Sequence, residues 1–300
     1  MSIYEDQQRP YIKRCISVQR EIYSEGKRLS TLQVFVLILS IVFVSYAAYF
    51  YDGSMGITKD GVRAVAGLFN VICIFIIQSL SDKSCEKQGE AASLQQYIDA
   101  HLYSDVIGNN VKEWQYVKNK TDIDEILGRY PQCDGSAIGT WYEDYSAYNP
   151  YVQVAKCQME NVFWDDYLRG YYLWFLTIVL VAILTVMAGI CLINHIDIVA
   201  VFLIISGVLP LIKFYWSVYR KIQKDRKRLS KLKEQSNRLL QCMLDSKVKN
   251  KNYVSALIVL QEGIFENRKS CFLIPDWFHF HFLDKIHEKI QCREKISKEI

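Results

Sequence analysis

The chain has 300 residues, 51% of them hydrophobic and 23% charged, with a formal net charge of +4. These proportions exclude both an ordinary soluble globule and a protein buried almost entirely in lipid, because the apolar residues are concentrated in blocks. Nine cysteines without regular spacing argue against a secreted disulfide framework and favour reduced thiols at a cytoplasmic face.

The first two apolar blocks predict a transmembrane hairpin that covers residues 32–80. A polar segment, residues 1–31, precedes it and predicts a cytosolic N-terminal helix. The run Leu32–Phe50 has about the length that crosses the hydrocarbon core of a bilayer, and it closes on aromatic residues typical of membrane interfaces. Gly61–Leu80 is the returning span, and the short polar loop Asp52–Asp60 is expected on the outer side.

The second span carries a polar stripe. Its members recur every three or four positions and therefore share one helical face: Arg63, Gly67, Asn70, Ile74 and Gln78. This face is too polar to lie against lipid. It can join spans through interhelical hydrogen bonds, or it can line an aqueous path.

Residues 81–170 predict a cytosolic helical region, with helices near Glu90–Tyr103 and Val111–Leu127 separated by turn signals. A polar-aromatic helix, Gln158–Arg169, is expected to lead from this region into the membrane.

A second transmembrane hairpin is predicted within residues 171–219. Tyr171–Ile193 and Ile198–Ile212 are apolar, and only the four residues Asn194–Asp197 separate them. Because the turn is so short, the second helix must run straight back along the first.

Residues 220–300 predict a cytosolic C-terminal region that begins with the dense basic segment Arg220–Lys233. Apolar residues at heptad-like spacing predict one long helix that continues out of the fourth span. Val254–Phe265 predicts a further helix, and a last helix, Leu283–Ile300, follows a break at Ile274–Trp277.

These patterns predict an all-α integral membrane protein, in which four transmembrane helices form two hairpins and carry a helical cytosolic domain. Of the 36 Lys and Arg residues, only Lys59 and Arg63 lie in or beside the two short loops. Since cytoplasmic segments are enriched in Lys and Arg, both termini and the middle region are expected in the cytoplasm.

The sequence holds none of the motifs that mark common active sites, such as GxSxG, a Walker loop or HExxH. Three histidines, at 279, 281 and 287, lie near Cys271, but no CxxC or HExxH accompanies them. We therefore expect no metal ion, no cofactor and no enzymatic activity, and neither DNA nor RNA as a partner.

Polar and aromatic side chains instead gather in patches at helical spacing, and they are the candidate ligand-binding residues: Trp141, Tyr142, Gln158, Asn161, Trp164, Asp165, Arg169, Gln261, Arg268 and Trp277. Amides can read base edges, aromatic rings can stack on bases, and arginines can neutralise phosphate. Asp165 and Arg169 are also spaced for an i,i+4 ion pair. The alternative interpretation is that these faces pack together as a membrane-proximal scaffold. The basic segment most simply contacts anionic lipid, with phosphate binding as the second interpretation.

The order of these motifs and spans resembles the SMODS-associated four-transmembrane pore-forming effectors. The resemblance is carried by Gln19–Lys27 before the first span, by Trp141-Tyr142, by Gln158-x-x-Asn161-x-x-Trp164-Asp165 with Arg169, and by Gln261-x-x-Ile264-x-x-x-Arg268 with Ile274–Phe278. The chain departs from the family pattern at Gly26, where alanine is expected, and at His279, where tyrosine is expected.

The resemblance implies a bacterial antiphage effector of a cyclic-oligonucleotide-based antiphage signalling system (CBASS). Such an effector would sit in the inner (plasma) membrane, bind a cyclic oligonucleotide second messenger and assemble as a homo-oligomer. It would then form a pore or disrupt the bilayer, causing abortive infection. We expect a tetramer, because four spans seldom enclose a pore alone. Two other functions stay open. One is a ligand-independent membrane scaffold or partner-binding protein, and the other is a membrane-anchored enzyme built on Trp141, Asp165 and Arg169.

Overall fold

The computed structural model describes residues 2–46, 58–107, 118–193, 198–245 and 253–282. These residues form helices and connecting turns, with no strand in any of the described ranges. The helices are α1 (Ile3–Asp6), α2 (Pro10–Ser45), α3 (Lys59–Leu102), α4 (Ser104–Ile107), α5 (Lys120–Gly128), α6 (Pro150–Ile193), α7 (Ile198–Leu244) and α8 (Tyr253–Ser270). Residues 276–282 add a further helical segment after α8.

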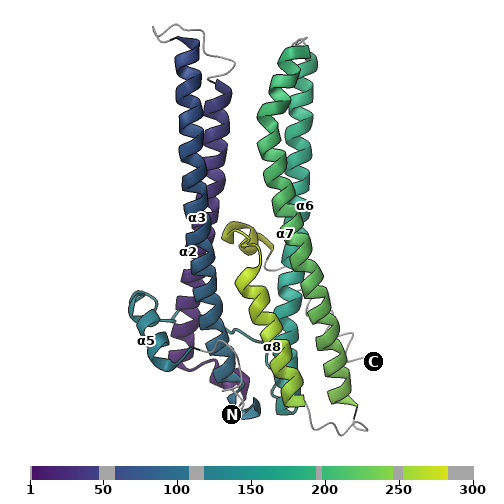
Figure 1. Cartoon of the computed structure of the whole chain (residues 1–300). Helices are drawn as coiled ribbons and strands as arrows, with labels where there is room; N and C mark the ends of the chain where they lie inside the picture. Colours follow the sequence, from purple (N-terminus) through teal and green to yellow (C-terminus); the bar gives the residue numbers. More distant parts are fainter. Residues whose placement is uncertain (1, 47–57, 108–117, 194–197, 246–252, 283–300) are drawn as a thin grey trace.

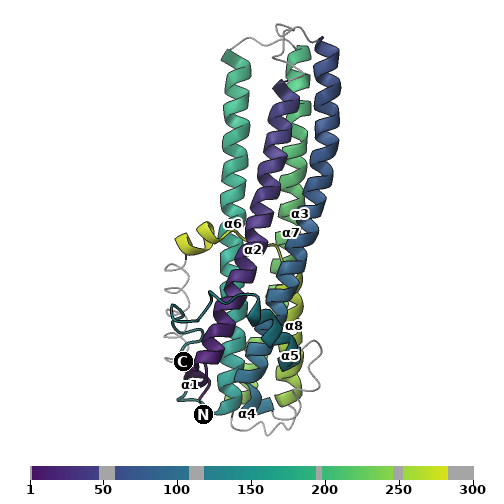
Figure 2. The same cartoon turned by 90° about the vertical axis from the view of Figure 1, so that its left-hand side faces the viewer.

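Two pairs of long helices set the architecture (Figures 1 and 2). α2 pairs with α3, and α6 pairs with α7. In the upper half the two pairs stand apart, whereas in the lower half α8 lies between them and contacts α3, α6 and α7. The short helix α5 lies outside the first pair. The lower half is therefore a helical domain in which both pairs meet.

The upper half presents apolar side chains to its surroundings. Large hydrophobic residues on three helices are more than half exposed: Phe35, Val42, Leu68, Phe75, Trp174 and Val186. The segments Ala64–Leu102 of α3 and Pro150–Val186 of α6 are long and apolar enough to cross a bilayer. A surface this apolar is unfavourable in water and suits contact with lipid. The expected four-span arrangement stays a prediction.

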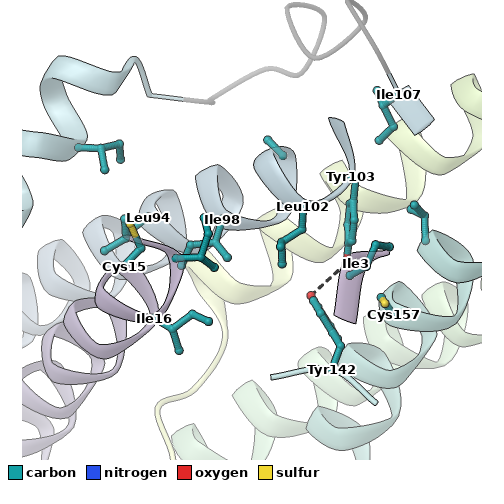
Figure 3. Close-up of a cluster of buried hydrophobic side chains, with 14 of the residues drawn as sticks. Ile3, Cys15, Ile16, Leu94, Ile98, Leu102, Tyr103, Ile107, Tyr142 and Cys157 are labelled. Carbon is teal, nitrogen blue, oxygen red and sulfur yellow. Dashed lines mark hydrogen bonds between the residues drawn. The ribbon is translucent and has the colours of Figure 1, made fainter. Parts of the chain in front are cut away.

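The largest core of the lower half joins α2, α3, α6 and the loop before α6. Ile16 of α2 packs in this core with Leu94 and Ile98 of α3, and all three are fully buried (Figure 3). Tyr103 and Tyr142 close the cluster, and the Tyr103 hydroxyl donates a 3.0 Å hydrogen bond to that of Tyr142. Each large apolar side chain buried here contributes about 1.5–3 kcal/mol.

The long helices do not break where the predicted segments end. The expected helix Glu90–Tyr103 is not a separate element, because α3 is continuous from Lys59 to Leu102. Gln158–Arg169 is likewise part of α6. The prediction that the basic segment continues the fourth span as one helix is confirmed by α7.

The helix predicted near Val111–Leu127 begins at Lys120 instead, because the Asn119 side chain accepts a hydrogen bond from the backbone N–H of Asp122 and caps it there. Residues 111–117, the turn Asn194–Asp197 and the last predicted helix, Leu283–Ile300, lie outside the described residues.

Candidate ligand-binding site

A cavity of about 360 Å³ lies in the lower half, between the two helix pairs and under the segment that follows α8. We call it the interhelical cavity. Six of the ten predicted ligand-binding residues line it: Trp141, Tyr142, Asn161, Trp164, Asp165 and Arg268. Residues that were more than 120 positions apart in sequence are thus brought around one space. Arg20, Tyr23 and Lys27 of α2 complete the wall.

A buried carboxylate behind the cavity organises its polar wall. Asp99 of α3 is fully buried and accepts hydrogen bonds from Tyr142 Oη (2.7 Å), Gln261 Nε2 (2.8 Å) and Arg268 Nη1 (2.6 Å). Asn161 Nδ2 donates to the same Tyr142 hydroxyl at 2.7 Å. The Asp99 network therefore fixes side chains from α3, α6, α8 and the loop before α6.

Arg268 and Tyr142 keep their usual protonation states within this network. Burial disfavours the charged form of Arg268, but the adjacent Asp99 carboxylate outweighs it and raises the pKa of the guanidinium above its ordinary value. Burial and the same carboxylate raise the pKa of the Tyr142 hydroxyl well above its usual range. Arg268 thus stays a cation and Tyr142 stays a hydrogen-bond donor.

Two aromatic rings form the sides of the cavity. Trp141 lies under the Arg20 guanidinium, which is 5.3 Å from the ring centroid. Trp164 stacks on His279 with ring centroids 6.1 Å apart. Burial, followed by the nearby Lys27 charge, lowers the pKa of His279 to about 4, so this ring is neutral at pH 7. The two tryptophans that line the cavity thus offer aromatic surface to a flat group.

The other four predicted residues do not line the cavity: Gln158, Gln261, Arg169 and Trp277. Gln158 donates to Gln261 at 3.0 Å within the buried network. Trp277 is 58% exposed and packs edge-on against Phe175 of α6. Their positions fit support of the cavity rather than direct contact with its contents.

Arg169 is held by three contacts within the fold. It forms the expected i,i+4 pair with Asp165 at 2.9 Å and a second pair with Asp225 of α7 at 3.3 Å. It also donates to the backbone carbonyl of Phe272 at 2.9 Å. Burial opposes its charge, but both carboxylates together raise its pKa. Arg169 therefore fastens α6 to α7 and to the segment after α8.

Residues 271–282, which we call the crossing segment, connect both helix pairs at the upper edge of the cavity (Figure 1). Asp276 accepts hydrogen bonds of 2.6 Å from Ser24 and Lys27 of α2. Phe278 is buried and packs edge-on against Tyr172 of α6, with ring centroids 5.0 Å apart. The segment thus bridges α2 and α6 while its own residues line the cavity.

The polar stripe of α3 lies on an exposed face of the chain. Gly67, Asn70 and Gln78 are all exposed, although Asn70 accepts a 2.7 Å hydrogen bond from Ser40 of α2. The side chain of Arg63 lies outside the described part. The stripe thus makes one interhelical contact and leaves most of its surface available to a further chain or to water.

Three functional candidates escaped the sequence-based prediction: Arg20, Asp99 and Asn267. Gln88, Gln95 and Asp99 recur at spacings of seven and four on α3, and all three are buried. This second row of polar residues, nearer the end of α3, was the sequence signal for Asp99. Arg20 and Asn267 have no comparable signal, because only the fold brings them to the cavity.

Comparisons with known proteins identify relatives of the chain by sequence. A family model described as the SMODS-associating 4TM effector domain matches residues 1–294. A probable CBASS effector molecule of Bacillus cereus (strain VD146) is 25% identical over 289 residues, which cover 94% of each chain. No solved structure matches this chain.

Proposed function

The chain belongs to the family of SMODS-associating 4TM effectors, and from this premise we propose that it binds a cyclic oligonucleotide in the interhelical cavity and permeabilises the bacterial inner membrane as a homo-oligomer. The family acts in antiphage defence, and the two long apolar helices indicate association with a membrane. The chemistry of the cavity supports the class of ligand that we propose. The exposed apolar faces of the upper half support the proposed action on the membrane.

The observation that carries the proposal is the composition of the cavity wall. It combines two tryptophans, amide side chains and guanidinium groups around one space of about 360 Å³. Aromatic faces stack on bases, amides pair with base edges, and arginines pair with phosphates. A nucleotide carries all three partners in one molecule. An apolar metabolite would make no use of the amide and guanidinium groups.

The crossing segment can transmit the effect of ligand binding to the upper halves of the long helices. A ligand in the cavity touches Leu273, Ile274 or His279 of this segment, which also holds α2 through Asp276 and packs on α6 through Phe278. Moving it would change how the two helix pairs sit against each other. To shift a closed to open ratio from 1:99 to 99:1, the ligand must favour the open arrangement by about 5.5 kcal/mol.

The membrane part is proposed to consist of four spans with both termini in the cytoplasm. Several copies, a tetramer in the simplest case, would assemble through the exposed stripe of Asn70 and Gln78 on α3. Polar side chains on a lipid-facing helix are unfavourable, so a neighbouring copy or a water-filled path would satisfy them.

Leakage from liposomes tests the proposal. Purified full-length protein in liposomes with an enclosed dye is mixed with a panel of cyclic di- and trinucleotides. Release of dye by at least one of them is expected. Absence of release with the whole panel, in vesicles shown to contain folded protein, would contradict direct gating.

A matched pair of tryptophan variants tests the location of the site. Trp141→Ala should weaken nucleotide binding by about tenfold or more, because base–aromatic stacking contributes about 1–3 kcal/mol. Trp277→Ala removes an exposed ring that does not line the cavity, and its affinity should stay within about threefold of the original. Equal losses in both variants would place the ligand elsewhere. Unchanged ligand concentration after long incubation would in addition exclude turnover by a membrane-anchored enzyme.

A further inference from the structure

Three residues that line the cavity each carry a buried polar atom that makes no hydrogen bond within the described structure: Trp141 Nε1, Asn267 Oδ1 and Arg268 Nη2. Their chemical character is unambiguous. Indole and guanidinium nitrogens can only donate. The amide nitrogen of Asn267 donates to Asp165 Oδ2 at 2.8 Å, which identifies its oxygen as the free acceptor. The residues that line the cavity thus hold two donors and one acceptor that have no hydrogen-bond partner among the described residues.

Unsatisfied buried groups of this kind are costly, and their presence in a cavity points to a ligand that satisfies them. That ligand group must contain both acceptors and a donor. A phosphodiester contains acceptors only, so it cannot satisfy Asn267 Oδ1. A nucleobase carries acceptors and N–H donors on one flat ring.

The charges of the interior also disfavour a phosphate there. Arg268 is paired with Asp99, and Lys27 is paired with Asp276, both at 2.6 Å. Asp165 lines the same space and is itself paired with Arg169 at 2.9 Å. An anion in the interior would therefore meet cations that are already neutralised.

Arg20 differs from the other cations of the wall. It is exposed, its guanidinium lies over the Trp141 ring, and no carboxylate pairs with it among the described residues. It therefore places an available positive charge at the solvent side of the cavity, next to an aromatic face.

We infer that the interhelical cavity takes one nucleobase of the cyclic oligonucleotide, while Arg20 holds the adjoining phosphodiester at the solvent side. The base satisfies Asn267 Oδ1 and the two donors, and Trp141 contacts both parts of the ligand. A cavity of about 360 Å³ is at the lower end of the usual range of about 300–1,000 Å³, which suits one nucleoside of a larger ligand. This inference rests on the proposed function and assigns separate roles to Arg20 and Asn267.

The two roles have different signatures in a binding experiment. Full-length protein in detergent is titrated with cyclic dinucleotides that carry adenine, guanine or uracil, at several salt concentrations. Arg20→Gln should lower the affinity for all the cyclic dinucleotides by a similar factor. It should also reduce the slope of log affinity against log salt concentration by about one. Arg28→Gln is the matched control, because it lies two turns further along α2, is exposed and does not line the cavity. It should change neither quantity.

Asn267→Leu should instead change the ratio of affinities between bases by about tenfold and leave the salt slope unaltered. If this variant does not fold, Trp141→Phe provides the same test, because it removes the indole donor and keeps a stacking ring, although a smaller one. A reduced salt slope in Asn267→Leu, or an altered base ranking in Arg20→Gln, would overturn the assignment. So would unaltered binding in all variants, and the proposed function would survive each of these results. Failure of the original protein to bind any cyclic oligonucleotide would overturn both.

Discussion

Arg268 of α8 donates a 2.6 Å hydrogen bond to Asp99 of α3, and this ion pair joins segments 169 positions apart in a fully buried position. α3 belongs to the first helix pair, whereas α8 follows the second. The pair therefore connects the two halves of the chain directly beside the cavity.

Asp99→Asn should destabilise the protein by about 3–5 kcal/mol, because it leaves the Arg268 charge buried without its counter-ion. Thermal unfolding in detergent measures the effect. Glu21→Gln is the control, since it breaks the more exposed Arg28–Glu21 pair and should cost less than about 1 kcal/mol. Similar melting temperatures for both variants would contradict a structural role for the buried pair.

His279 should make the stability depend on pH. Burial, then the Lys27 charge, lowers its pKa from 6.5 to about 4, with Asp276 acting in the opposite direction. Between these two values the unfolded state binds a proton that the folded state does not, so stability falls as the pH decreases through this window. His279→Tyr keeps a ring against Trp164 and should remove that part of the dependence. If the melting temperatures of the original protein and of His279→Tyr fell equally from pH 7 to pH 4, the effect would be ruled out.

Asp276→Ala should separate binding from permeabilisation. The substitution releases the crossing segment from Ser24 and Lys27, and it leaves Lys27 without its 2.6 Å partner in the cavity wall. We expect nucleotide affinity to be equal or higher and nucleotide-triggered dye release to fall by about tenfold or more, a coupling loss of about 1.4 kcal/mol. Dye release at the original level would show that the segment does not transmit binding.

Asn70→Leu combined with Gln78→Leu should abolish permeabilisation without changing nucleotide affinity. Both side chains are exposed on one face of α3, and leucine removes their capacity to contact a neighbouring chain or water. Phe75→Leu, at another exposed position of the same helix, is the control and should keep activity. Dye release by the double variant equal to that of the control would favour a role of the stripe in folding alone.

Gly135→Ala should destabilise the loop before α6. Gly135 has φ +82°, and a Cβ there would lie 2.6 Å from the backbone nitrogen of Arg14. The left-handed conformation alone costs about 1–2 kcal/mol for alanine, and the contact adds to it. Gly139→Ala has open space around it and should be close to neutral. Equal melting temperatures of the two variants would disprove the requirement.

The sequence predicted long apolar helices because hydrophobic length and helical periodicity are local properties. It predicted the family correctly because short motifs keep their order along the chain. The continuous α7 shows the first point well. Heptad-like spacing alone predicts one shared face for Ile222, Leu229, Leu232, Leu239 and Met243. The first three are buried and the last two are half-buried. The Asp165–Arg169 pair was predictable for the same reason, as its partners are one helical turn apart.

The composition of the cavity was less predictable, because it depends on contacts between distant segments. Arg20 comes near Trp141 only through the packing of α2 against the loop before α6. Trp277 belongs to a predicted patch, yet its ring turns toward Phe175 and away from the cavity. Helical spacing could not reveal which way such side chains point.

Gly26, where the family pattern has alanine, lies against the crossing segment. A Cβ at this position would lie 3.2 Å from Leu273 of the crossing segment. The glycine therefore lets that segment lie closer to α2 than alanine would.

The length and continuity of α3 and α6 affect how a movement in the lower half is transmitted. α3 and α6 each contain 44 residues and run from the cavity into the upper half. Each is in effect a stiff lever of about 66 Å, so a tilt of about 5° at its lower end displaces its tip by about 6 Å. Ordinary helix packing distances are about 8–10 Å. A small rotation at the wall of the cavity is thus amplified along the helix, and no residue of the upper half has to refold.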